Sequence, residues 1–249
     1  MSRCVPDTQR YPRPWLNDSL TAPAILENVV FVCRGILFDV DGVLVDSTAA
    51  VARVWRRWAE ERGLDPEIVI HEAHGRRSIE TVRALAPHLD AELENEHVES
   101  LEIADREGIV ALPGAAELLR WLPADRFSLV TSATRALAVA RLEHAGLRVP
   151  ERLISADDVA DGKPSPEPYL NGAALLGLRS RDCLVFEDTA AGIESARRAG
   201  MQVVALDTTY RARALAAADA LAGTLADVQI QVDEDEMTVT VADKQGRNE

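Results

Sequence analysis

A largely apolar run that ends in two acidic residues constrains the fold of this chain more than any other feature. Residues 29–38 consist mostly of Val, Ile, Leu and Phe, and the sequence D-V-D-G follows at residues 39–42. Such a run is typical of a strand that is buried on both faces, as in the parallel sheet of an α/β protein. A sheet of this kind forms its ligand crevice at the carboxyl ends of its strands. The sequence therefore predicts an α/β fold with Asp39 and Asp41 at that crevice.

The proximity of Asp39 and Asp41 to a buried strand limits their chemistry. Two neighbouring carboxylates there are costly unless a cation or a shared proton offsets their repulsion. A hard divalent metal ion is therefore the natural occupant, and nucleophilic attack by a carboxylate is the natural reaction. A plain surface turn is the alternative, because Asp-Gly pairs often form turns. A calcium loop of the EF-hand type is excluded, because Val43 replaces an oxygen ligand and Gly42 comes too early.

Most of the remaining chain alternates strands with helices. After residue 112, strands are predicted at residues 127–131, 153–155, 183–186 and 202–206. The helical patterns between them indicate a parallel, Rossmann-like sheet with right-handed crossovers. Residues 48–111 show helical patterns and no strand pattern, so they form an all-helical cap inserted after the first strand. The predicted core thus comprises residues 28–47 and 112–249.

The two ends of the chain depart from this alternation. Residues 1–27 contain four prolines and little periodicity, and we expect a mobile N-terminal arm. Residues 228–232 and 237–241 alternate apolar and polar side chains around four consecutive acids. This pattern predicts a C-terminal β-hairpin that adds antiparallel strands to the edge of the sheet.

Charge and cysteine content limit the partners and the compartment. The net charge of −14 argues against nucleic acid and against anionic membrane surfaces as partners. No apolar run approaches the roughly 20 residues of a membrane span, and the N-terminus lacks the pattern of a signal peptide. The three cysteines are widely spaced, and Cys33 and Cys183 lie in strand-like runs. We expect both to be buried and reduced, in a cytoplasmic protein.

Polar side chains follow four of the predicted strands. They are Asp39 and Asp41, Thr131 and Ser132, Lys163, and Glu187 and Asp188. The carboxyl ends of parallel strands share one edge of the sheet, so these residues converge there. Each group alone has a plainer explanation as a turn, a helix cap or a solvated side chain. Together they indicate one reactive site.

Four short motifs around these residues carry a resemblance to a known family. They are D-V-D-G-V-L-V-D-S at residues 39–47, V-T-S at 130–132, G-K-P-S-P-E-P at 162–168 and F-E-D-T-A-A-G at 186–192. In type and order they resemble the four motifs of the haloacid dehalogenase-like hydrolase superfamily, over residues 35–207. The helical insertion after the first motif is similar to the cap of its sugar-phosphatase and phosphomutase branch.

The resemblance implies a nucleophile, an acid–base group and a metal site. Asp39 would attack phosphorus and form an aspartyl phosphate, and Asp41 would protonate the leaving alcohol and later activate water. Mg²⁺ would be held by Asp39, Asp188 and the main-chain carbonyl of Asp41, with Glu187 acting through a bound water.

The resemblance also implies groups that hold the phosphate. Thr131 and the backbone N–H groups of Ser132 and Ala133 would bind its oxygens at a helix start. Lys163 would balance the negative charge around Asp39.

Substrate choice is expected to come from the cap. We expect residues 71–77 to form a polar link, and residues 74–78, H-G-R-R-S, resemble the cap loop that faces the active site in sugar-phosphate members. Gly75, Arg76 and Arg77 are therefore candidate specificity residues, because a guanidinium there could pair with hydroxyls or a phosphate.

Three functions remain open on the sequence. The first is a Mg²⁺-dependent phosphatase for small sugar or polyol phosphates, acting as a monomer or weak homodimer on a phosphorylated metabolite. The second is a phosphomutase of the β-phosphoglucomutase kind, although the predicted helix over residues 48–62 lacks the His that is characteristic of that branch. The third is a non-catalytic binding protein on the same fold, against which the intact Asp39, Asp41, Lys163 and Asp188 argue.

Overall fold

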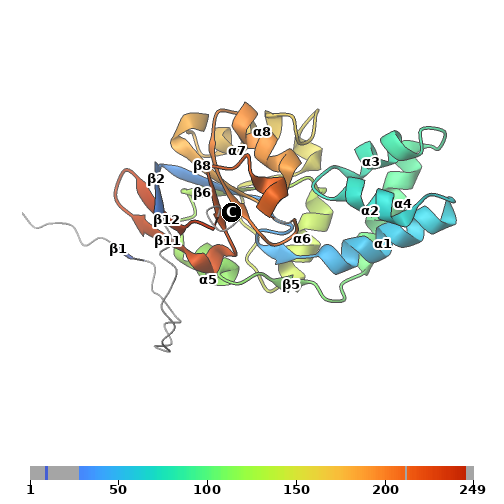
Figure 1. Ribbon diagram of the computed structural model, residues 1–249, viewed down its shortest axis with the longest axis horizontal. Helices are drawn as coiled ribbons and strands as arrows, with labels where there is room; N and C mark the ends of the chain where they lie inside the picture. Colours follow the sequence, from blue (N-terminus) through green and yellow to red (C-terminus); the bar gives the residue numbers. More distant parts are fainter. Residues whose placement is uncertain (1–8, 11–27, 211, 245–249) are drawn as a thin grey trace, which may run out of the picture.

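A six-stranded parallel sheet forms the centre of the structure, a computed structural model that describes residues 9–10, 28–210 and 212–244 (Figure 1). The strand order is β10-β9-β8-β3-β6-β7, and every neighbouring pair is parallel. The bounds are Gly35–Phe38 for β3, Phe127–Val130 for β6, Leu153–Ile154 for β7, Cys183–Glu187 for β8, Gln202–Leu206 for β9 and Ala220–Ala222 for β10. The predicted α/β class with a Rossmann-like core is confirmed.

The apolar run before Asp39 forms two strands, which corrects the prediction of a single strand. β2 spans Asn28–Cys33 and β3 spans Gly35–Phe38. All four residues of β3 are buried, but β2 has an exposed face on which Val30 is 56% exposed. The chain changes sheets at Arg34, so that only β3 belongs to the parallel sheet. Hydrophobicity alone did not reveal this break.

The predicted C-terminal hairpin is present, but it lies in a second sheet rather than at the edge of the first. β11 spans Val228–Val232, and β12 spans Met237–Ala242 and pairs antiparallel with both β11 and β2. The order of this sheet is β1-β11-β12-β2, where β1 is Gln9–Arg10. The rest of the predicted N-terminal arm, residues 1–8 and 11–27, lies outside the described residues.

Helices cover both faces of the parallel sheet (Figure 1). The helices α5 (Ala115–Trp121) and α6 (Arg135–His144) pack with Ile36 and Phe38 on one face. The helices α7 (Glu167–Leu175) and α8 (Ala190–Arg198) pack with Leu37 on the other. Since side chains alternate across a strand, the short β3 supplies apolar contacts to both layers and is fixed in place just before Asp39.

The inserted block is helical except at its end, where the expectation of no strand is wrong. Its helices are α1 (Thr48–Glu61), α2 (Pro66–Ala73), α3 (Ser78–Leu85) and α4 (Ala91–Ala104). The short strand β5 (Val110–Ala111) then pairs with β4 (Val45–Asp46), so the chain leaves the core and returns to it side by side. The expected polar link over residues 71–77 is shorter, because α2 continues through Ala73.

The inserted helices have a hydrophobic core of their own. It includes Val51, Trp55, Trp58, Val69 and Val98, and Trp58 is fully buried. The Trp58 indole N–H donates a 2.7 Å hydrogen bond to Glu94 Oε2, which satisfies its polar group. The helices therefore pack around Trp58 as a unit beside the sheet (Figure 1).

Candidate active site

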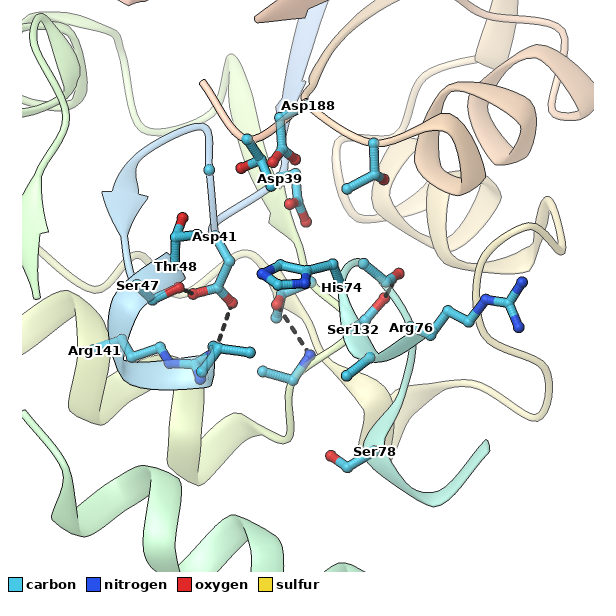
Figure 2. A pocket seen from close by; sticks show the side chains of 18 of the residues that line it. Asp39, Asp41, Ser47, Thr48, His74, Arg76, Ser78, Ser132, Arg141 and Asp188 are labelled. Atoms are coloured by element: carbon cyan, nitrogen blue, oxygen red, sulfur yellow. Dashed lines mark hydrogen bonds and ion pairs between the residues drawn. The ribbon is translucent and has the colours of Figure 1, made fainter. Parts of the chain in front are cut away.

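The structure brings the polar residues of all four motifs to one edge of the parallel sheet. Asp39 follows β3, Thr131 follows β6, and Glu187 and Asp188 lie at the end of β8. Lys163 reaches the same place from the loop between β7 and α7. These side chains are all buried, and Figure 2 shows Asp39 and Asp188 side by side. The site faces a cavity between the sheet edge and the inserted helices.

Lys163 binds two of the carboxylates directly. Its Nζ lies 2.7 Å from Asp39 Oδ1 and 2.6 Å from Glu187 Oε1, and it is 3.3 Å from the carbonyl oxygen of Val130. The side chain is only 2% exposed. Burial alone would lower the pKa of this amine, but Asp39 and Glu187 outweigh that effect and raise the pKa. Lys163 is therefore a fixed positive charge beside Asp39.

Both oxygens of Glu187 are fully engaged by the protein. Oε1 accepts from Lys163 and from the Tyr169 hydroxyl at 2.9 Å. Oε2 accepts from the backbone N–H groups of Asp188 and Thr189 and from the Thr189 hydroxyl, at 2.9 to 3.0 Å. Burial opposes ionisation, but Lys163 and these donors lower the pKa of Glu187. Glu187 thus orients Lys163 and the start of α8.

Asp39, Glu187 and Asp188 form a group that fits a hard cation. One carboxylate oxygen from each lies within 4.8 Å of the others, and all three side chains are buried. Among the described residues, Asp188 Oδ1 is buried without a hydrogen-bond partner. Gly42 leaves space for Asp188, since a Cβ on Gly42 would lie 1.9 Å from Asp188 Oδ2. An unpartnered buried carboxylate oxygen beside a second carboxylate suits Mg²⁺, which prefers oxygen ligands.

The protonation behaviour of the site follows from the crowding of its carboxylates. Burial raises the pKa of Asp39 to about 7; Lys163 opposes this shift, and the Glu187 carboxylate adds to it. Burial also raises the pKa of Asp188 well above its usual range, and Glu187 and Asp39 add to the effect. A divalent cation between Asp39 and Asp188 would favour the ionised form of both.

Thr131 and Ser132 lie at the cavity, next to the start of α6. Thr131 Oγ1 accepts from the backbone N–H of Ala133 at 3.1 Å, one of the groups expected to bind phosphate. Ser132 Oγ donates to the carbonyl oxygen of Gly75 at 2.9 Å. The second motif therefore contacts the loop between α2 and α3 as well as the cavity.

Asp41 is held by two side chains, neither of which was among the predicted site residues. Ser47 Oγ donates to Asp41 Oδ1 at 2.6 Å, and Arg141 Nη1 donates to Asp41 Oδ2 at 2.8 Å (Figure 2). Arg141 lies on α6, and its other terminal nitrogen, Nη2, donates to Glu102 Oε1 on α4 at 3.2 Å.

The sequence does contain a signal for Arg141. It lies in the apolar helical pattern with Leu137, Ala138 and Leu142, all of which are buried. An arginine on the buried face of a helix implies buried acidic partners. The sequence alone could not name Asp41 and Glu102 as those partners.

The loop between α2 and α3 touches the core through Gly75. Gly75 has φ +77, and a Cβ there would lie 2.8 Å from Thr189 Cγ2. Together with the bond from Ser132, this close approach holds the loop against the second and fourth motifs. The inserted helices thus form part of the wall of the cavity.

His74, Arg76 and Arg77 in this loop point in different directions. The His74 ring faces the cavity near Asp41 and Ser132, whereas the Arg76 side chain points away from Asp39 (Figure 2). Arg76 pairs with Glu72 at 3.2 Å and is 44% exposed. Arg77 does not line the cavity but binds Glu80 and the carbonyl oxygens of Val159 and Ala160.

His74 has a ring nitrogen without a protein partner at the cavity. Its Nδ1 lies 2.6 Å from the carbonyl oxygen of Ile70, so Nδ1 carries the hydrogen. Its Nε2 is buried and has no partner among the described residues. His74 belongs to the predicted cap loop but is not among the predicted site residues.

Named phosphatases are similar to this chain in sequence. Hexitol phosphatase A of Escherichia coli (strain K12) is 43% identical over 180 residues, which cover 70% of this chain and 83% of that protein. Glycerol-1-phosphate phosphohydrolase 2 of Saccharomyces cerevisiae is 37% identical over 189 residues, covering 70% and 74% respectively.

Solved structures share the fold. A hydrolase from Pseudomonas syringae superposes with a TM-score of 0.71 at 26% identity, over 78% of this chain and 95% of that chain. A β-phosphoglucomutase from Clostridium difficile superposes with a TM-score of 0.65 at 22% identity, over 78% and 92%. The profile of the haloacid dehalogenase-like hydrolases matches residues 33–200. This chain therefore belongs to the haloacid dehalogenase-like hydrolase family.

Proposed function

We propose that this protein is a Mg²⁺-dependent phosphatase that hydrolyses small sugar or polyol phosphate monoesters through an aspartyl phosphate. The observation that carries the proposal is Asp39, buried between Lys163 and Asp188 at a sheet edge that faces a covered cavity. The relatives support the substrate class, because hexitol phosphatase A and glycerol-1-phosphate phosphohydrolase 2 are named for polyol phosphates.

In this mechanism Asp39 attacks the phosphorus atom, and the bond from phosphorus to the substrate's ester oxygen breaks. Asp41 donates a proton to that oxygen as the alcohol leaves, and then accepts one from the water that hydrolyses the aspartyl phosphate. Lys163 holds one oxygen of Asp39, which leaves the carboxylate in a fixed orientation. The backbone at Ser132 and the Thr131 side chain lie at the cavity, where phosphate oxygens would bind.

Asp39, Asp188 and the main-chain carbonyl of Asp41 would hold Mg²⁺. The ion would neutralise phosphate charge and so permit attack by a carboxylate. We assign Glu187 a supporting role, because both of its oxygens already accept several protein hydrogen bonds. Its negative charge keeps Lys163 in place and complements the cation site.

We assign catalysis to residues 28–47 and 112–249 and substrate choice to the cap, residues 48–111. His74 Nε2 supports this division, because an imidazole nitrogen without a protein partner can form a hydrogen bond with a substrate hydroxyl. The Gly75 backbone contributes the close contact with the core. Of the predicted cap cations, Arg76 lies at the cavity rim and Arg77 at the joint between cap and core.

We propose a cytoplasmic enzyme, acting as a monomer or weak homodimer. None of the helices in the described part of the chain is long and apolar enough to cross a membrane. Cys33 and Cys183 are free and buried, and burial raises the pKa of each thiol to about 12. Thiols of this kind are unreactive and agree with a reducing compartment.

A panel of phosphomonoesters tests the proposal. Hexitol, glycerol and hexose phosphates are incubated with enzyme and Mg²⁺, and released phosphate is measured. We expect turnover of the polyol or sugar esters that EDTA abolishes and Mg²⁺ restores, and no turnover with Asp39→Asn. Phosphate release that is indifferent to EDTA, or that persists in Asp39→Asn, would contradict it.

One arm of the panel separates the phosphatase from the mutase. β-Glucose 1-phosphate is supplied with a trace of the bisphosphate, and glucose 6-phosphate is measured by a coupled assay. We expect free phosphate and no accumulation of glucose 6-phosphate, because α1 carries no His. Accumulation of the isomer would favour the mutase.

A further inference from the structure

A second buried ion-pair network lies at the cavity, apart from the cluster around Asp39. Its centre is Arg141, which is 5% exposed and comes from α6 of the core. The guanidinium contacts Asp41 on the loop after β3 and Glu102 on the cap helix α4. The phosphatase mechanism gives no role to Arg141 or to Glu102. A buried guanidinium is costly unless acidic partners compensate its charge, so the contacts with Asp41 and Glu102 stabilise Arg141 in its buried position.

The contacts fix the orientation of the Asp41 carboxylate. Arg141 Nη1 binds Oδ2 at 2.8 Å, and Ser47 Oγ binds Oδ1 at 2.6 Å. Each carboxylate oxygen therefore has a donor of its own (Figure 2). A side chain that gives up a proton to a leaving group must be held close to the productive geometry, because small misplacements reduce the rate strongly.

Glu102 connects this orientation to the cap. Its side chain is 5% exposed and accepts from Arg141 Nη2 at 3.2 Å. Since α4 belongs to the inserted helices and α6 to the core, this bond joins the two parts across the cavity. A planar guanidinium with several fixed donors can bind two carboxylates at once, whereas a lysine ammonium acts as a point charge.

We infer that Arg141 is a positioning residue that holds Asp41 in its reactive orientation, and that Glu102 makes this hold depend on cap closure. The inference rests on the proposed phosphatase function, with Asp41 as general acid. When the cap opens, Arg141 loses one of its two acidic partners. The acid is therefore fully positioned only over a covered substrate.

Leaving-group dependence distinguishes this role from a merely structural one. A substrate that releases an alkyl alcohol needs a proton from Asp41, whereas nitrophenyl phosphate releases a stable anion that does not. The ratio kcat/KM covers only the steps up to departure of the leaving group, so the later role of Asp41 as base does not enter. General acid catalysis contributes about 10²- to 10⁴-fold where it is needed.

The experiment compares Arg141→Met and Arg141→Lys with the wild type on a polyol phosphate and on nitrophenyl phosphate, with Mg²⁺. For Arg141→Met we expect kcat/KM to fall about 10²-fold on the polyol ester and much less on the nitrophenyl ester. Arg141→Lys should also lower kcat/KM selectively for the polyol ester, but by a smaller factor. This variant provides the test if Arg141→Met does not fold. Equal losses on both esters would overturn the inference.

The second part of the experiment tests Glu102. If Glu102 acts through Arg141, Glu102→Ala should lower kcat/KM selectively for the polyol ester, and the double variant should be no worse than Arg141→Met alone. Glu102→Gln, which retains an acceptor for Arg141, should recover part of the loss. Additive effects of the two substitutions would overturn the link to the cap. A wild type that hydrolyses neither ester would instead refute the proposed function.

Discussion

At the scale of single residues, the position of Asp188 depends on the missing side chain of Gly42. A Cβ at Gly42 would lie 1.9 Å from Asp188 Oδ2, and Gly42 also has φ +78. We expect Gly42→Ala to displace the Asp188 carboxylate and to weaken Mg²⁺ affinity about 10- to 100-fold, as for other changes beside metal ligands. A Mg²⁺ titration of the phosphatase activity measures this effect.

Gly63 provides a matched control for the backbone strain. It has φ +67, and a Cβ at this position would have no described neighbour within 4 Å, so Gly63→Ala carries the left-handed strain without the clash. We expect a loss of about 1 to 2 kcal/mol in the free energy of unfolding and a normal response to Mg²⁺. If the two variants respond alike to Mg²⁺, the space at Gly42 does not determine the metal site.

Glu187 is expected to contribute mainly to stability. Glu187→Gln leaves the buried Lys163 with Asp39 as its remaining carboxylate partner. We expect the free energy of unfolding to fall by about 3 kcal/mol, at the low end for a broken buried ion pair. Tyr169→Phe, which removes one 2.9 Å hydrogen bond to Glu187, should cost about 1 kcal/mol. Urea denaturation measures both, and a Tyr169 effect larger than the Glu187 effect would contradict this ranking.

The sequence could place the acids and Lys163 at one edge because parallel strands share their carboxyl ends. It could not show the contacts of Arg141, Glu102 or His74, which join segments far apart in the chain. Nor could it separate Arg76 from Arg77, since their neighbouring positions say nothing of which guanidinium binds Val159 and Ala160.

At the scale of the elements, Arg77 is expected to hold the cap against the core. It binds Glu80 in α3 and the carbonyl oxygens of Val159 at 3.2 Å and Ala160 at 2.9 Å. We expect Arg77→Ala to raise KM about tenfold, roughly 1.4 kcal/mol, for sugar, polyol and nitrophenyl phosphates alike, because closure serves them all. Steady-state kinetics on the three ester classes provide the measurement.

Arg83 offers the control for this change. It is an arginine on α3, the helix that begins directly after Arg77, and it is paired with Glu92 and 54% exposed. We expect Arg83→Ala to leave KM unchanged, because exposed ion pairs contribute little. A loss confined to sugar phosphates in Arg77→Ala would mean that this residue contacts substrate instead of closing the cap.

Helices and strands could be predicted wherever a single hydrophobic pattern runs through the whole segment. The alternation of strands and helices after residue 112 predicts the parallel sheet, and apolar spacing predicts α1. The break at Arg34 was not predictable, because β2 and β3 are both apolar although they join different sheets. The hairpin could be recognised from its own alternation, but its partner β2 depends on that break.

At the scale of the whole molecule, the carboxylates beside Asp39 oppose folding unless a cation compensates them. Asp188 Oδ1 is buried without a partner among the described residues. We expect Mg²⁺ to raise the melting temperature, by an amount equivalent to about 2.7 kcal/mol at a hundredfold excess over its Kd. Differential scanning fluorimetry with and without EDTA measures this, independently of activity.

Asp188→Asn is the matched variant for that measurement. It removes the charge while retaining nearly the same shape, so the stabilisation by Mg²⁺ should largely disappear. The variant without Mg²⁺ should be at least as stable as the wild type without Mg²⁺, because one of the crowded carboxylates is gone. An undiminished Mg²⁺ shift in Asp188→Asn would place the ion elsewhere.

The account rests on Asp39 as the nucleophile, and trapping of the phosphoenzyme tests this most directly. Enzyme is quenched in acid during turnover of a phosphomonoester, reduced with tritiated borohydride and digested with trypsin, which releases residues 35–53 as one peptide. Reduction expels the phosphate from an acyl phosphate and leaves tritium on the carbon that carried it. We predict that this peptide carries tritium as homoserine in place of Asp39, and that Asp39→Asn takes up none. Tritium at Asp41 or Asp46, or turnover without tritium uptake by the wild type or by Asp41→Ala, would contradict the account.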